Sequence, residues 1–146
     1  MATVNEVYGF LDKLAPFDLQ MDFDNAGFLV GRGETQVKRL LVALDITLPV
    51  AEEAAEKGCQ LIVSHHPVIF HPVKALTDQS ATGRVLLALA EGHMAAICAH
   101  TNLDAVMGGV NCCLARTLEL KALEQLHQDG LDHEGRPYGI GRVGTA

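Results

Sequence analysis

Short apolar runs alternate with amphipathic segments along most of the 146-residue chain. Three of the apolar runs have the length of buried strands: Arg39–Leu44, Leu61–Ser64 and Met94–Ala99. A continuous apolar run of this length, bounded by turn signals, is typical of a parallel strand covered on both faces. We therefore predict that these three segments form the centre of a mostly parallel sheet.

Helix signals separate the three strands. A capping box at Thr3 and Glu6 opens the first helix. Thr47 can cap a second helix that ends at Gly58, and a third is expected over residues 83–91. Two β-α-β units in succession require right-handed crossovers. The pattern predicts an α/β fold: a mostly parallel sheet with helices on both faces.

The last third of the chain shows weaker patterns. We expect a helix from about Val110 to Leu118, a turn at Asp129–Gly130 and a further strand over Tyr138–Val143. At this length, residues 1–146 are expected to form a single α/β lobe.

Composition narrows the classes of protein. Hydrophobic residues make up 49% of the chain, enough for a packed core, and the net charge of −7 argues against a nucleic-acid partner. No signal peptide is recognisable, and no apolar run reaches the roughly 18 residues of a membrane span. The four cysteines form no C-x-x-C pair, which favours free thiols in a reducing compartment. We expect a cytoplasmic protein.

Histidines stand where two of the predicted strands end. His65 and His66 follow Ser64 directly and precede Pro67, and a second strand runs into His100, with Asp104 four residues later. Open α/β sheets place their ligands at the carboxyl ends of parallel strands. These side chains, together with Asp45, are therefore expected at one edge of the sheet.

This combination suggests a divalent-metal site. Neighbouring strand residues point to opposite faces, so the rings of His65 and His66 should be splayed and suit two ions better than one. Asp104 could bridge the ions, and His100 could be a ligand or a proton donor beside them. Imidazole and carboxylate donors favour Zn, Fe or Mn over calcium.

A structural interpretation competes with this one. A single histidine at a strand end is more often a hydrogen-bonded structural group, and it is the pairing of His-His-Pro with His-x-x-x-Asp that favours metal. His71, His93, His127 and His133 are expected to be solvated. Asp24 is expected to be a turn former, because Asp bonds its own backbone.

Four segments resemble one known family: Asp24-Asn25-x-Gly27, Ser64-His65-His66-Pro67, His100-Thr101-Asn102-Leu103-Asp104 and Gly108-Gly109-Val110-Asn111. They are similar to the GTP cyclohydrolase 1 type 2 family of NIF-three-like dinuclear-metal proteins. The resemblance implies two divalent ions held by His65, His66 and Asp104, with His100 at the site. It also implies a toroidal homo-oligomer, often a hexamer.

One departure from the family pattern is expected to matter. Members usually continue for about another hundred residues, a second lobe of ordinary domain size. That lobe adds a His-x-x-x-Glu pair to the metals, and nothing after Val110 has this spacing. The chain thus resembles the N-terminal part of a bilobal fold, with an incomplete site.

Two functions remain in competition. The first is a metal-dependent hydrolase acting on a purine nucleotide, as in GTP ring opening, or on a similar small molecule. In that case water activated by the metal would attack and His100 would be the catalytic group that moves protons. The alternative is a non-catalytic metal-binding or oligomeric scaffold protein.

Overall fold

The computed structural model describes all 146 residues. Its helices are α1 (Val4–Leu14), the 3-10 helix η1 (Phe17–Leu19), α2 (Leu48–Glu56), α3 (Ala81–Glu91), α4 (Thr101–Ala105) and α5 (Val110–Thr117). Its strands are β1 (Ala2–Thr3), β2 (Gly27–Val30), β3 (Gln36–Val37), β4 (Leu40–Ala43), β5 (Leu61–Ser64), β6 (Ala95–Cys98), β7 (Lys121–Gln125), β8 (Gly130–Leu131), β9 (Pro137–Tyr138) and β10 (Arg142–Thr145).

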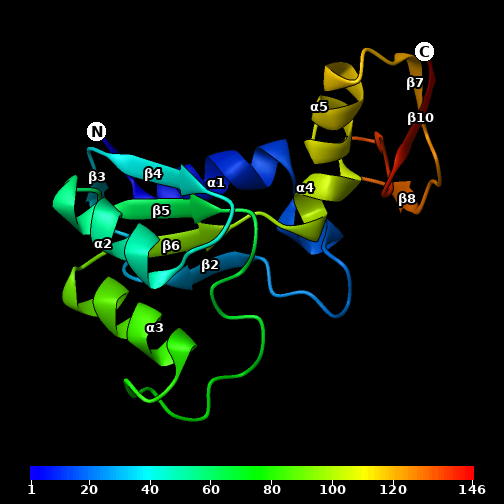
Figure 1. The fold of residues 1–146 in the computed structure, drawn as a ribbon. Coiled ribbons are helices and arrows are strands. Elements are labelled where there is room, and N and C mark those ends of the chain that lie inside the picture. Colours follow the sequence, from blue (N-terminus) through cyan, green and yellow to red (C-terminus); the bar gives the residue numbers. More distant parts are fainter.

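The centre of the molecule is a four-stranded sheet with the order β2-β6-β5-β4 (Figure 1). β4, β5 and β6 are parallel to one another, as the apolar runs predicted. Leu61 of β5 pairs with Leu40 on one side and with Ala95 on the other. β2 joins the free edge of β6 in the antiparallel direction. The carboxyl ends of the three parallel strands therefore meet at one edge of the sheet.

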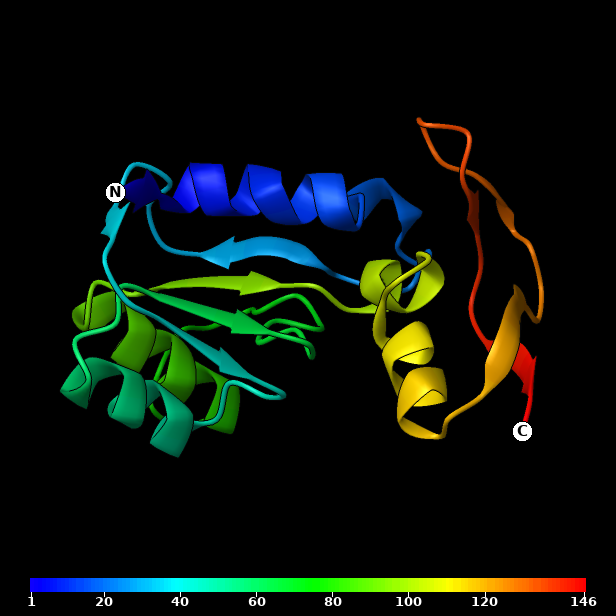
Figure 2. The ribbon, with the colours of Figure 1, turned by 90° about the horizontal axis from the view of Figure 1, so that it is seen from above.

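Helices cover both faces of this sheet, which confirms the predicted fold class. α1 lies on one face, and α2 and α3 lie together on the other (Figure 2). The apolar cluster under α1 includes Val4, Leu61 and Ile97, and the cluster under α2 and α3 includes Ile62 and Leu89. Alternate residues of β5 thus point into two separate cores, as expected of a strand covered on both sides.

The predicted helix ends are present. Thr3 forms a complete capping box, because its side chain accepts from the Glu6 backbone while the Glu6 carboxylate accepts from the Thr3 N–H at 2.7 Å. Thr47 caps α2 by accepting from the Val50 N–H at 3.4 Å. Gly58 follows α2 with a positive φ of 64°, the conformation that favours glycine.

The C-terminal part differs in detail from the prediction. α5 is present, but the tight turn lies at residues 132–135 and not at Asp129–Gly130, where β8 begins. The strand expected over Tyr138–Val143 is broken into β9 and β10. Gly139 and Gly141 have φ values of 156° and 90°, which interrupt the extended backbone between them. The pattern of hydrophobic residues in the sequence did not indicate the displaced turn or the break in the strand.

Arg142 of β10 fastens this C-terminal part to the rest of the molecule. Its Nη2 donates to the carbonyl oxygens of Ala105 at 3.2 Å and Val106 at 2.8 Å, which are the last residue of α4 and the residue that follows it. Its Nη1 donates to the Gly139 carbonyl at 2.8 Å. One guanidinium thus joins β10, the preceding loop and the end of α4.

No helix of the protein has both the length and the apolar character that crossing a membrane requires.

Candidate metal centre

The backbone bends immediately after β5, and this bend decides where the first two histidines point. β5 ends at Ser64, so His65 and His66 lie outside the regular strand. The Ser64 hydroxyl donates to the His66 carbonyl at 2.8 Å, and the Cys98 thiol donates to the His65 carbonyl at 2.8 Å. Hydrogen bonds from two buried side chains therefore hold the bend in place.

Because of this bend, His65, His66 and His100 converge. One ring nitrogen from each lies within 4.8 Å of the others. The ring centroids are 5.1 Å apart for His65 and His66, and His100 lies 5.1 Å and 5.5 Å from them. The prediction that His65 and His66 are splayed is wrong, since strand alternation no longer applies where the strand has ended. We refer to these three residues as the histidine cluster.

The Nδ1 atom of every ring in the histidine cluster has a partner. His65 Nδ1 lies 2.9 Å from the Ala99 carbonyl oxygen, His66 Nδ1 lies 2.7 Å from Asp45 Oδ1, and His100 Nδ1 lies 2.9 Å from Asp24 Oδ1. Carbonyl and carboxylate oxygens only accept, so a neutral ring donates Nδ1–H and keeps its lone pair on Nε2. All three Nε2 atoms are thereby left available as ligands.

Asp24 was missed as a site residue. Its side chain is fully buried and accepts from His100, from the hydroxyl and N–H of Thr101, and from the Asn25 N–H. Burial alone would raise the pKa of Asp24. The hydrogen bonds from Thr101 and His100 outweigh this, so the pKa lies below its ordinary value. Asp24 does form a local turn contact with Asn25, but its main partners are 76 and 77 residues away.

Asp104 lies at the margin of the cluster. It is on α4, one turn after His100, and its Oδ1 lies 3.7 Å from His65 Nε2. The side chain is 22% exposed and therefore accessible to an ion from the solvent side. The structure thus brings all four predicted site residues together, His65, His66, His100 and Asp104.

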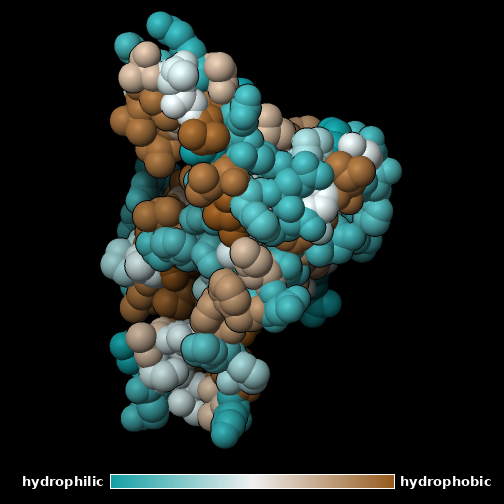
Figure 3. Space-filling view, turned by 90° about the vertical axis from the view of Figure 1, so that its right-hand side faces the viewer, coloured by the Kyte–Doolittle hydropathy of each residue, from teal (hydrophilic) through white to brown (hydrophobic).

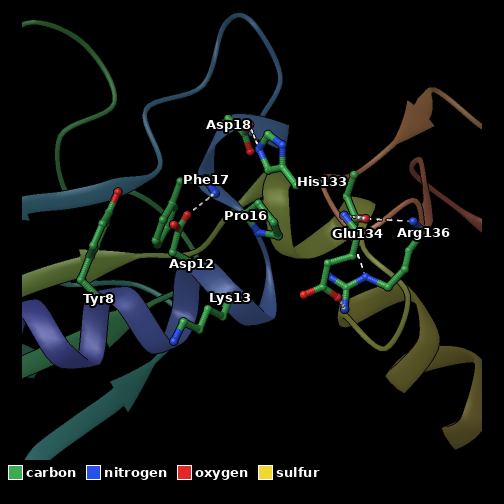
Figure 4. Close-up of a pocket in the computed structure, with 10 residues that line it drawn as sticks. Tyr8, Asp12, Lys13, Pro16, Phe17, Asp18, His133, Glu134 and Arg136 are labelled. Carbon is green, nitrogen blue, oxygen red and sulfur yellow. Dashed lines mark hydrogen bonds and ion pairs between the residues drawn. The ribbon is translucent and has the colours of Figure 1, made fainter.

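Two of the cavities are lined by both histidine and aspartate side chains. One, of about 340 Å³, adjoins the histidine cluster and is lined by His66, Asp45, Thr82 and Arg84 among others. Another, of about 430 Å³, lies between α1, η1 and the β8–β9 hairpin and contains no residue of the cluster (Figure 4).

Most charged groups of the second cavity are paired with one another. His133 Nε2 lies 2.8 Å from Asp18 Oδ2, and Arg136 contacts Asp132 at 2.7 Å and Glu134 at 3.0 Å (Figure 4). His133, although largely exposed as predicted, therefore has a carboxylate partner. The cavity beside His66 is the better candidate for a ligand, because it adjoins the histidine cluster.

Comparison with known proteins agrees with the geometry. The model of the Duf34/NIF3 (NGG1p interacting factor 3) family matches residues 2–146. The chain belongs to this family. A Clostridium perfringens protein named GTP cyclohydrolase 1 type 2 homolog is 35% identical over 140 residues, 96% of this chain and 52% of the relative. The resemblance read from the four sequence segments is thus confirmed.

Solved structures of the family share this fold. A Bacillus cereus protein related to NIF3 superimposes with a TM-score of 0.83 at 34% identity, covering 88% of this chain and 36% of that one. Reduced HcgD from Methanocaldococcus jannaschii gives a TM-score of 0.79 at 32% identity, covering 88% and 52%. The chain spans about half the length of the curated relatives it matches.

Proposed function

We propose that this protein binds a divalent metal ion through His65, His66 and His100, with Asp104 beside them. The observation that carries the proposal is the anchoring of all three Nδ1 atoms, which leaves the Nε2 lone pairs free in three rings whose nitrogens come within 4.8 Å of one another. Metal-binding histidines characteristically donate their other ring nitrogen to a carbonyl or carboxylate in this way.

The donor set fits a transition-metal ion. Three imidazoles and one carboxylate suit Zn²⁺, Fe²⁺ or Mn²⁺, whereas Ca²⁺ and Mg²⁺ prefer oxygen. The convergence of the three rings favours one ion at the histidine cluster. Asp104 could contribute to a second ion, as the family resemblance implies, but the four side chains offer too few ligands for two complete shells.

A hydrolase acting on a small molecule is the second candidate function. The cavity beside His66 favours it, because its size and its mixture of polar and apolar walls suit a substrate. A divalent ion bound here would supply Lewis-acid chemistry, including a lowered pKa of water. Arg84 could bind an anionic group of the substrate. His100, oriented by Asp24, could accept a proton at Nε2 in the manner of a catalytic base. Relatives named GTP cyclohydrolase 1 type 2 suggest a purine nucleotide.

Calorimetric titration with Zn²⁺ and Mn²⁺ tests the metal proposal. We expect binding by the unmodified chain and loss of detectable binding in His65→Ala and His66→Ala. His133→Ala is the matched control, because His133 also pairs with an aspartate but lies outside the cluster. Equal affinity in all of these proteins would contradict the proposal.

His100→Ala separates the two roles of His100. Loss of metal binding together with activity identifies a ligand. Retained binding with lost turnover of GTP identifies a proton-transfer group held beside the ion.

A further inference from the structure

Asp24 holds His100 from a position that solvent does not reach. Its side chain has no exposed surface, while the His100 side chain is 18% exposed. The two residues come from different parts of the fold, since Asp24 precedes β2 and His100 follows β6. The contact is therefore made by tertiary structure and not by a local turn.

The orientation of the Asp24 carboxylate is fixed independently of His100. Oδ1 accepts the Asn25 backbone N–H at 2.7 Å, and Oδ2 accepts the Thr101 backbone N–H at 3.1 Å. The Thr101 hydroxyl adds a further bond to Oδ2. Because each oxygen is bonded to a backbone group, the carboxylate cannot rotate, and Oδ1 always presents an acceptor to His100 Nδ1.

An acceptor on Nδ1 selects one form of the neutral imidazole. The proton must lie on Nδ1, and the lone pair must lie on Nε2, the nitrogen not bonded to Asp24. The other two aspartates that hydrogen-bond to histidines are much less confined. Asp45 beside His66 is 53% exposed, and Asp18 beside His133 is 57% exposed.

We propose that Asp24 is a positioning residue that locks His100 in the Nδ1–H tautomer and directs its Nε2 lone pair into the histidine cluster. The functional importance of this role rests on the proposed function, because both metal binding and proton transfer need the Nε2 lone pair of His100. The tautomer itself is a property of the metal-free chain and can be measured without any ion.

The decisive measurement is the imidazole nitrogen NMR spectrum of metal-free protein labelled with ¹⁵N-histidine, at a pH where the rings are neutral. His100→Gln assigns the resonances. We expect His100 in the unmodified chain to carry its proton on Nδ1 alone. In Asp24→Asn the amide nitrogen can donate to Nδ1, so we expect the Nε2–H form to appear.

Two control variants separate positioning from a general effect on folding. Thr101→Ala removes the hydroxyl bond to Asp24 but leaves the Asp24–His100 contact, so it should destabilise the fold without changing the His100 tautomer. Asp18→Asn removes the charge from an exposed aspartate–histidine pair and should change neither the stability of the fold nor the His100 tautomer. Far-UV circular dichroism confirms that each variant is folded.

Zinc affinity provides the second readout. Asp24→Asn is expected to weaken Zn²⁺ binding by about 10- to 100-fold, the usual effect of removing the partner of a histidine ligand. Asp18→Asn should leave it unchanged.

The outcomes distinguish the two proposals. An Nε2–H tautomer of His100 in the unmodified chain, or an unchanged tautomer in folded Asp24→Asn, would overturn the role of Asp24 whatever the metal affinity is. Should Asp24→Asn not fold, the spectrum of the unmodified chain still decides. A chain that binds no zinc but shows the Nδ1–H tautomer would refute the metal site and leave the positioning role intact.

Discussion

His66 Nδ1 lies 2.7 Å from Asp45 Oδ1, so the second residue after β5 is oriented by the carboxylate of the second residue after the neighbouring strand β4. Both side chains are about half exposed, at 45% and 53%. Solvent therefore competes for this contact, unlike the buried contact between Asp24 and His100.

This difference in exposure predicts that substitutions of Asp45 and Asp24 weaken metal binding to different degrees. Asp45→Asn should weaken Zn²⁺ binding by no more than about 10-fold, the lower end of the range for a partner of a histidine ligand. The exposed His66 ring can still turn its Nε2 towards an ion while water satisfies Nδ1. Parallel titrations of Asp45→Asn and Asp24→Asn test this order. A larger loss in Asp45→Asn would show that exposure does not govern the effect.

The thiols should differ sharply in reactivity. Burial, together with the nearby Asp24 charge, raises the pKa of the Cys98 thiol to about 12. Cys98 should therefore stay protonated and unreactive in the native protein at pH 8. Cys59 and Cys112 should also be unreactive, because both are buried and a reagent in solution does not reach them. Exposed Cys113 should give one fast thiol per chain with Ellman's reagent, and all four should react in denaturant.

The Cys113→Ser variant is the control for this assignment, since it should show no fast thiol. The raised pKa of Cys98 also has a consequence for stability. The folded state favours the neutral thiol, so this contribution is fully present below the unfolded pKa of about 8.5 and is lost as the pH rises towards 12. A second thiol that reacts rapidly in the native chain would contradict the assignment of Cys113 as the reactive thiol.

Asn102 should be important for stability. It is fully buried, its Nδ2 donates to the Ala15 carbonyl at 2.7 Å, and its Oδ1 accepts from the His100 N–H at 2.9 Å. Asn102→Ala would leave both groups unsatisfied and should cost about 1–3 kcal/mol in the free energy of unfolding. Asn5→Ala, at an exposed position, should change it by less than about 0.5 kcal/mol.

Urea unfolding monitored by circular dichroism measures both variants. Equal midpoints for Asn102→Ala and the unmodified protein would show that water replaces the lost partners.

We propose that the chain associates with itself, and exposed apolar surface supports this. Hydrophobic residues gather along one side of the molecule (Figure 3). Helix α5 exposes Leu114 and Leu118. The edge strand β4 exposes Leu40 and Val42, and Leu44 directly after it is exposed as well. Unpaired edges with apolar side chains invite pairing with another chain.

Sedimentation velocity over a range of concentrations tests the surfaces. Val42→Lys and Leu114→Lys should each shift the distribution towards monomer, because a buried charge opposes association. Val73→Lys, which replaces an exposed valine in the loop before α3, should leave it unchanged. A monomeric unmodified chain at high concentration would refute self-association.

The sequence was most informative where structure is local. Apolar runs and helix caps predicted β4, β5, β6 and the helices between them, because strand burial and capping depend on neighbouring residues. The placement of His65, His66 and His100 at one edge of the sheet followed from parallel topology. These parts of the site needed no knowledge of long-range contacts.

The remaining features depended on distant partners. The convergence of His65 and His66 requires a bend held partly by Cys98, which lies 33 residues from His65. Asp24 has a turn-forming sequence context, and nothing nearby in the chain reveals its bond to His100. Only the family resemblance marked Asp24, without indicating what the side chain does.

Arg142 supports the helix that carries Asp104, whereas other parts of the fold hold the three histidines of the candidate centre. Its hydrogen bonds hold the carbonyls of Ala105 and Val106, the two residues directly after Asp104. The histidine cluster is instead held by β5, β6 and Asp24. Arg142 is thus the contact through which β10 supports the end of the helix that carries Asp104. The imidazole side and the carboxylate side of the candidate centre are therefore anchored to different parts of the fold.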